Sequence, residues 1–274
     1  MAHPIDCHLF TTMLKKSPPR SATQPAKPSS REVKYYGTAA CRTLWLQRPG
    51  DVIRIYIEEP LIKHFSDLLK WAATQRKAYH IVSSEEMEKI TESVHHQGIC
   101  LLARDKPQAH FPSLLKSLKA DQKPQLLVYL DGVENPHNLG AIVRSCAHFG
   151  IRHILGEAGK LPRLSPSACR VAEGGAEFVE LVALDKPLDQ LKQLKQLGFT
   201  LLATAMQRGH DLYHYDIPEH TVLIFGAEEH GVSQAMFEAA DTTLHIPGTG
   251  HVESLNVSVA FALIAGENYR QRME

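Results

Sequence analysis

The chain has 274 residues, of which 43% are hydrophobic and 22% are charged, and its 30 basic residues balance its 30 acidic ones. This length and composition are typical of a globular protein with two domains or one large one. No apolar run is long enough to cross a bilayer, and the N-terminus lacks the apolar segment of a secretory signal. A formal net charge of zero argues mildly against a general nucleic-acid binder, although a local basic patch stays compatible with it.

The cysteines and histidines indicate a reduced protein without a metal site. The five cysteines are scattered and form no C-x-x-C pair, which favours reduced thiols in the cytosol over a disulfide scaffold or a zinc site. The sixteen histidines show no metal-ligand spacing, and the adjacent His95 and His96 are interpreted as a solvated turn.

Residues 1–30 are rich in Pro, Ser, Lys and Thr and predict a disordered basic tail. A non-specific RNA tether is one role for such a tail. A plain flexible leader is the other, and we favour it.

Residues 31–105 predict a small α/β domain. Strands are expected at 52–57, 79–82 and 99–103, where β-branched and apolar residues gather. A helix is expected between the first two strands, with an apolar stripe formed by Leu61, Phe65, Leu68, Leu69 and Ala72. Residues 106–124 contain three prolines around a short Leu-rich turn and predict a polar linker.

From Leu126 the pattern alternates between strand and helix, which is typical of a parallel sheet covered on both faces. Six strands are expected, at residues 126–130, 152–155, 178–182, 200–204, 222–225 and 243–246. A helix stripe follows the first of them, formed by Leu139, Ile142, Val143 and Cys146.

The last of these strands leads into a glycine-rich loop and then a helix. Pro247, Gly248 and Gly250 interrupt the strand, and a helical spacing of apolar residues begins after Asn256. Ser254 and Asn256 therefore lie where backbone N–H groups gather and favour a polar or anionic group. Both residues are also common helix caps, which is the alternative interpretation.

Three stretches, at residues 131–150, 223–233 and 244–260, together resemble the three motifs of the SpoU branch of the SPOUT superfamily. The resemblance covers residues 126–270 and implies an RNA 2′-O-ribose methyltransferase that uses S-adenosylmethionine. It also implies an α/β domain with a deep trefoil knot. Tyr36-Gly37 and His96-Gln97-Gly98 more loosely resemble an L30e-like substrate-binding domain; an unrelated small α/β domain is the alternative.

The resemblance also implies the site residues. Arg144 matches the catalytic arginine, and its polar surroundings are Asn138, Glu228, Ser254 and Asn256. The S-adenosylmethionine pocket is formed by Thr204, Gly226, Ile246, Leu255 and Val257. Without the motifs, Arg144 would be interpreted as a solvated helix charge and the apolar residues as ordinary core. Ala227 stands where many members carry Asn, a variation that also occurs in the family.

We therefore expect a cytoplasmic S-adenosylmethionine-dependent methyltransferase that acts on a ribose of tRNA or rRNA and needs no metal. A homodimer is also expected, because SpoU enzymes pair through the catalytic domain and the last helix carries Leu263 outside its apolar stripe. A non-catalytic RNA-binding protein with the same fold is the alternative. A classical Rossmann enzyme is disfavoured, because no G-x-G-x-x-G motif follows the first strand of the parallel sheet.

The family scheme makes Arg144 the base that receives the 2′-hydroxyl proton. A guanidinium normally stays charged, so an electrostatic role towards the forming alkoxide is the other interpretation.

Overall fold

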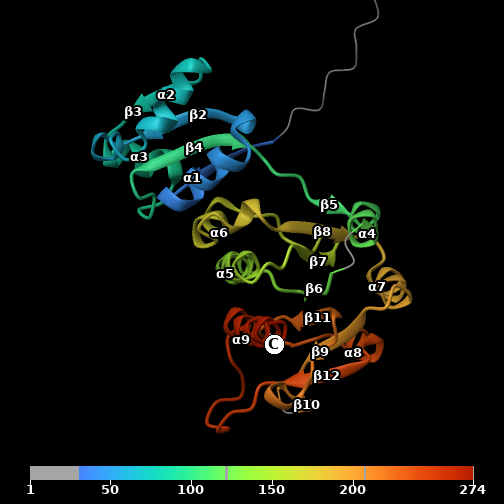
Figure 1. The fold of residues 1–274 in the computed structure, drawn as a ribbon. Helices are drawn as coiled ribbons and strands as arrows, with labels where there is room; N and C mark the ends of the chain where they lie inside the picture. Colours follow the sequence, from blue (N-terminus) through green and yellow to red (C-terminus); the bar gives the residue numbers. More distant parts are fainter. Residues whose placement is uncertain (1–30, 121–122, 207, 274) are drawn as a thin grey trace, which may run out of the picture. The chain divides into compact units, whose positions relative to one another are not determined.

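The computed structural model describes residues 31–120, 123–206 and 208–273, which form two β-sheets with their helices (Figure 1). The predicted tail at residues 1–30 lies outside this range. In the ranges described, none of the helices combines the length and the hydrophobicity that a membrane span requires.

The first sheet has four strands and is formed by residues before 105. Its strands, in spatial order, are β1 (Glu32–Tyr36), β4 (Ile99–Arg104), β2 (Val52–Ile57) and β3 (Ala78–Ile81). β4 pairs antiparallel with β1 and β2, whereas β3 pairs parallel with β2. The three strands predicted in this segment are confirmed, and β1 was not predicted.

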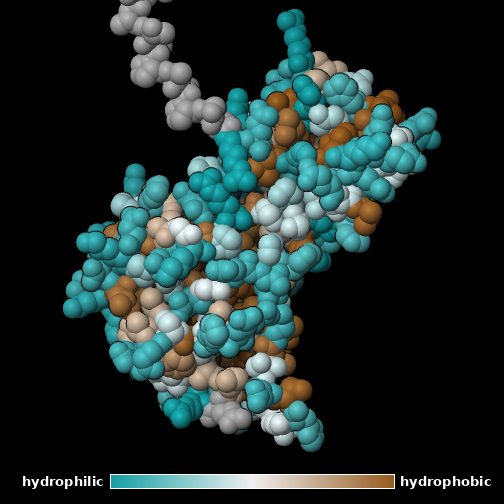
Figure 2. Space-filling view, turned by 180° about the vertical axis from the view of Figure 1, so that it is seen from behind, coloured by the Kyte–Doolittle hydropathy of each residue, from teal (hydrophilic) through white to brown (hydrophobic). Residues whose placement is uncertain are grey.

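The helical elements of this segment are α1 (Thr38–Gln47), α2 (Ser66–Thr74), α3 (Ser84–Thr91) and the 3₁₀ turns η1 (Pro49–Asp51) and η2 (Glu59–Leu61). The predicted helix stripe begins too early, because Leu61 ends η2 and the helix starts at Ser66. His96 is buried, and its Nδ1 accepts a hydrogen bond from the Gly98 N–H. The expectation of a solvated His95–His96 turn is therefore wrong for His96. Hydrophobic side chains remain exposed on this segment, and Figure 2 shows them among hydrophilic neighbours.

The second sheet has eight strands, all paired in parallel. In spatial order they are β10 (His210–Asp211), β12 (Thr242–His245), β9 (Thr200–Thr204), β11 (His220–Gly226), β6 (Gln125–Asp131), β7 (His153–Glu157), β8 (Glu180–Leu184) and β5 (Ala109–His110). The six strands predicted here are found, although β8 begins two residues later than expected, at Glu180. β5 and β10 were missed because two residues are too few to show a period.

Helices cover both faces of this sheet (Figure 1). One face carries α5 (Pro136–His148), α6 (Pro166–Val171) and α9 (Val257–Gln271); the other carries α4 (Phe111–Ala120), α7 (Pro187–Gln196) and α8 (Gln234–Ala239). Along β6, Val128 and Leu130 pack into the first core, and Leu127 and Tyr129 into the second. Successive strand residues point to opposite faces, so both sets are buried. The predicted α/β class with a doubly covered parallel sheet is confirmed.

Residues 106–120 are more ordered than the predicted linker. β5 pairs with β8, and α4 buries Phe111, Leu114 and Leu118 against the large sheet. These three residues recur at helical spacing, and Pro112 suits the first turn of a helix. The prolines therefore mark the start of an element here.

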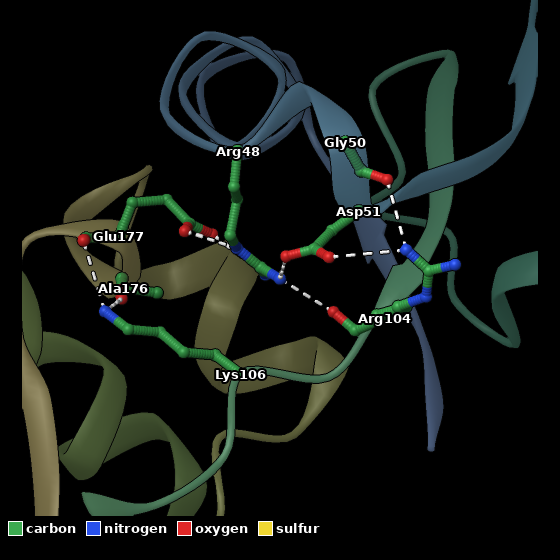
Figure 3. A network of polar contacts seen from close by, with 7 residues as sticks. All are labelled: Arg48, Gly50, Asp51, Arg104, Lys106, Ala176 and Glu177. Atoms are coloured by element: carbon green, nitrogen blue, oxygen red, sulfur yellow. Dashed lines mark hydrogen bonds and ion pairs between the residues drawn. The ribbon is translucent and has the colours of Figure 1, made fainter. Parts of the chain in front are cut away.

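An ion pair joins the segment of the small sheet to that of the large one (Figure 3). Arg48 donates to both carboxylate oxygens of Glu177, at 2.7 and 3.2 Å, and Glu177 lies in the 3₁₀ turn η3 (Gly175–Glu177). The Glu177 side chain is 3% exposed, so its charge depends on Arg48 for compensation. Nearby, Lys106 Nζ donates to the carbonyl oxygens of Ala176, Glu177 and Val179.

Close packing fixes α5 against α6 and η3. A Cβ at Gly140 would lie 2.6 Å from the Ala168 carbonyl oxygen, and one at Gly175 would lie 3.1 Å from that of Val143. Larger residues would push these elements apart, because backbone atoms cannot rotate away as side chains can. The glycines thus set the distance between α5 and the turn that follows α6.

We predict opposite effects for two identical substitutions. Gly140→Ala should destabilise the fold by about 2 kcal/mol, because the added methyl overpacks the contact with Ala168. Gly266→Ala, in the interior of α9, should stabilise it by roughly 0.5 kcal/mol, since its nearest neighbour would be a ring carbon of Phe149 at 3.5 Å. Urea unfolding midpoints measure both, and equal shifts would contradict the close-packing argument.

We also predict that Glu177→Ala costs about 3 kcal/mol, because the partly buried Arg48 loses the nearer and more buried of its two carboxylate partners and keeps only Asp51. Glu157→Ala is the matched control, since its ion pair with Lys160 is exposed and should contribute at most about 1 kcal/mol. Thermal unfolding of the two variants gives the comparison. A Glu177→Ala variant as stable as the control would show that the Arg48 pair is dispensable.

Candidate active site

The carboxyl ends of four neighbouring parallel strands form one edge of the large sheet. Gly226 at the end of β11 is level with Asp131 at the end of β6. Thr204 at the end of β9 is level with Leu244 of β12, two residues before Ile246. Ligands of open α/β sheets bind at this edge, so the strands place Thr204, Gly226 and Ile246 where a ligand is expected.

Three side chains from distant parts of the chain meet next to this edge. Asn138 Nδ2 donates to Glu228 Oε1 at 2.8 Å, and Asn256 Nδ2 donates to the same oxygen at 2.7 Å. Asn256 Nδ2 also lies 3.0 Å from Asn138 Oδ1. Asn138 is buried in the first turn of α5, whereas Glu228 follows β11 and Asn256 precedes α9. We call these three residues the amide–carboxylate cluster.

Asn256 serves as a helix cap as well as a member of this cluster. Its Oδ1 accepts from the N–H of Ser258 at 2.9 Å and from the Ser258 hydroxyl at 2.6 Å. The side-chain oxygen thus caps α9, and the amide nitrogen faces Glu228. The two interpretations of Asn256 from the sequence are therefore compatible with each other.

Arg144 lies on α5, six residues after Asn138, and its ion-pair partner is not a member of the cluster. Its Nη2 forms an ion pair with Glu173 Oε2 at 2.9 Å, and its side chain is 58% exposed. Six residues advance a helix by about 9 Å and turn it by about 240°, so the two side chains leave α5 at different heights and in different directions. Ser254 is also separate from the cluster and lies exposed in the loop before α9.

The remaining predicted cofactor residues differ in burial. Thr204 Oγ1 donates to the Ile224 carbonyl oxygen at 3.0 Å. Leu255 is 45% exposed, whereas Val257 is buried in the core under α9. Position 226 requires glycine for packing as well as for the approach of a ligand, because a Cβ there would overlap the backbone of Gly231.

Two polar residues near the site were missed by sequence reasoning. Asp131 Oδ2 accepts a hydrogen bond from the Ser233 N–H at 2.8 Å, which ties the end of β6 to the start of α8. Its position directly after a buried strand was the available signal. Glu173 was missed because it lies between motifs; the Gly174-Gly175 pair that follows it was the available sign of a tight turn.

The chemistry of the site depends on amides, carboxylates and guanidinium groups. Burial raises the pKa of the Cys146 thiol on α5, so this thiol stays neutral. Across the described ranges, there is no group of three His, Cys, Asp or Glu residues placed to hold a metal ion.

Two family models match the chain. Residues 125–266 match the SpoU rRNA methylase family, and residues 36–109 match the family described as RNA 2′-O ribose methyltransferase substrate binding. Both matches fall on the segments already described, the first on the large sheet and the second on the small one.

Curated relatives carry related names. An uncharacterised tRNA/rRNA methyltransferase of Escherichia coli, YfiF, is 34% identical over 88% of this chain and 69% of its own. The 23S rRNA (guanosine-2′-O-)-methyltransferase RlmB of Neisseria meningitidis is 30% identical over 87% of this chain and 95% of its own.

Solved structures share the fold. The SpoU methyltransferase AviRb of Streptomyces viridochromogenes, in complex with AdoMet, superposes with a TM-score of 0.72 at 20% identity and covers 89% of this chain and 91% of its own. A structure described as an RNA 2′-O ribose methyltransferase gives 0.72 at 24% identity over 90% of this chain and 91% of its own. The sequence matches and the shared fold lead to one conclusion: this chain belongs to the SpoU rRNA methylase family and is an RNA methyltransferase.

Proposed function

We propose that the chain methylates the ribose 2′-hydroxyl of a nucleotide in tRNA or rRNA, with S-adenosylmethionine as the methyl donor. The observation that carries this proposal is the amide–carboxylate cluster at the carboxyl edge of the sheet, assembled from all three motif stretches. The names of the relatives, RlmB and YfiF, support the same substrate class.

The residues at the carboxyl edge fit an adenosine-containing cofactor. Leu255 is an exposed apolar side chain, and Ile246 is only partly buried, so both present apolar surface next to the strand ends. Thr204 and Gly226 end the two strands beside them. When bound, S-adenosylmethionine supplies an electrophilic methyl group on a sulfonium. The role of this chain is to bind it there and to exclude water from its adenine.

We assign the substrate side of the reaction to Arg144. Its guanidinium is exposed on the same helix that carries Asn138, and such a group can pair with the phosphates beside a ribose. The cluster fixes the loop before α9 relative to α5, because Glu228 accepts from an amide on each side. Ser254 lies in that loop and is assigned to substrate binding with it. Positioning of this kind is the main catalytic demand of an in-line displacement.

We predict that Arg144→Ala abolishes methylation while S-adenosylmethionine affinity stays within a few-fold of wild type. Arg144→Lys should be nearly inactive at every pH, because a lysine keeps the charge but lacks the planar fork. Single-turnover assays on RNA and calorimetry with the cofactor measure the two quantities. Near-wild-type turnover of Arg144→Ala would show that the site assignment is wrong, and absence of cofactor binding by the wild type would favour a non-catalytic RNA-binding protein.

We further infer a trefoil knot, a homodimer and a cytoplasmic location. The return of α9 across the sheet to α5 and β11 is compatible with the knot. Val259 and Leu263 are exposed on α9 while Phe261 and Ile264 are buried, so the helix has apolar surface on a second side. The four cysteines in the described ranges are reduced and buried, which suits a reducing compartment.

The dimer leads to a prediction for the exposed face of α9. Val259→Glu combined with Leu263→Glu should yield a monomer, because charges on an apolar interface are costly to bury. The protein is expected to be a dimer at micromolar concentration before substitution, as measured by light scattering. A wild-type monomer would contradict the proposed assembly, and a variant that stays dimeric would place the interface elsewhere.

A further inference from the structure

Glu173 lies between two guanidinium groups. Its Oε2 is 2.9 Å from Nη2 of Arg144, and its Oε1 is 3.5 Å from Nη1 of Arg170 on α6. Both ion pairs are partly exposed, and such pairs contribute little to folding stability. The arrangement is therefore better explained by the orientation that it gives the two arginine side chains than by a contribution to folding stability.

The backbone holds Glu173 in an unusual conformation. Its φ of 46° lies in the left-handed region, which few residues other than glycine adopt. The two following glycines wedge the turn between two helices: a Cβ at Gly174 would overlap Thr43 of α1, and one at Gly175 would crowd α5 at Val143 and Arg144. The turn has no room to shift, so the carboxylate is presented to Arg144 from a fixed place.

Arg170 extends the contact to the segment of the small sheet. Its Nε donates to the carbonyl oxygen of His95 at 3.2 Å. Its Cδ would lie 2.5 Å from a Cβ at Gly37, so the side chain passes over this glycine. A continuous series of polar contacts thus runs from His95 through Arg170 and Glu173 to Arg144.

We propose that Glu173 positions the Arg144 guanidinium for methyl transfer and that Arg170 couples this ion pair to the segment of the small sheet. The inference rests on the proposed catalytic role of Arg144. In this proposal Glu173 acts through Arg144 and makes no contact of its own with the substrate. It limits the rotation of a long, exposed side chain, and a reacting group that is misplaced by about 1 Å can cost a hundredfold in rate.

The test measures kcat, KM and cofactor affinity for Glu173→Gln in the full-length enzyme with an RNA substrate. Glutamine keeps the shape and the left-handed strain of the native residue but removes the charge. We expect kcat to fall about tenfold, with S-adenosylmethionine affinity and melting temperature unchanged. A purely structural role would instead lower the melting temperature and leave the kcat of the folded fraction unaltered.

Glu92→Gln is the matched control. Glu92 also has a positive φ, 55°, and also forms an exposed ion pair, with Lys34 at 3.3 Å. The same substitution there should leave kcat unchanged. A general effect of charge or of the left-handed conformation would lower kcat in both variants and would overturn the proposal.

The coupling through Arg170 is tested by a double-mutant cycle. Arg170→Gln should lower kcat, and the double variant with Glu173→Gln should be no slower than Glu173→Gln alone, because Arg170 acts through Glu173. Independent, multiplicative losses would overturn the coupling.

Two failures are distinguishable. If Arg144→Ala is inactive but Glu173→Gln has an unchanged or raised kcat, only the positioning role of Glu173 is overturned. If Arg144→Ala is active, the assignment of Arg144 fails first, and the positioning role fails with it.

Discussion

The close packing of α5 against α6 and η3 is the constraint on which the candidate site depends. At Gly140 the backbone of α5 approaches that of α6, and at Gly175 the backbone of η3 approaches that of α5. Any larger residue at either position would prevent this approach. Because α5 carries Asn138 in its first turn and Arg144 farther along, this packing locates both ends of the site together. It also places Glu173 within 2.9 Å of Arg144.

The second requirement is that the loop before α9 returns to α5. Asn256 caps α9 and at the same time donates to Glu228, which also accepts from Asn138. Glu228 accepts hydrogen bonds from two amides and so holds three stretches of chain together. It lies 90 residues after Asn138 and 28 residues before Asn256. Helix capping and site assembly therefore use the same side chain, and neither can change independently.

Strands and helices in which apolar residues recur at a regular spacing could be predicted from the sequence. The six strands of the large sheet and the stripe of Leu139, Ile142, Val143 and Cys146 follow alternation and helical spacing, and all four stripe residues are buried. β5, β10 and the order of residues 106–120 were not accessible, because short strands lack a period and prolines indicate helix starts as well as linkers.

The candidate site was accessible in part, for a similar reason. Motif residues such as Asn138, Glu228 and Asn256 could be named from the resemblance, and the structure brings them together. The pairing of Arg144 with Glu173 depends on a left-handed turn between two packed helices, and no local pattern encodes which carboxylate such a turn presents. An ion pair between two separate segments depends on how the chain packs, so a local sequence pattern does not predict it.

This pairing bears on how Arg144 can act. A guanidinium has five N–H donors and no acceptor, so in its charged form it can donate but cannot take a proton. Glu173 engages Nη2 from one side, and the exposed remainder of the group offers further donors to a ribose oxygen or a phosphate. A fixed cation beside the 2′-hydroxyl stabilises the forming alkoxide without itself becoming neutral. For the catalytic role that we propose for Arg144, the pairing with a carboxylate therefore favours an electrostatic function, with a phosphate or water as the proton acceptor, over a function as the base.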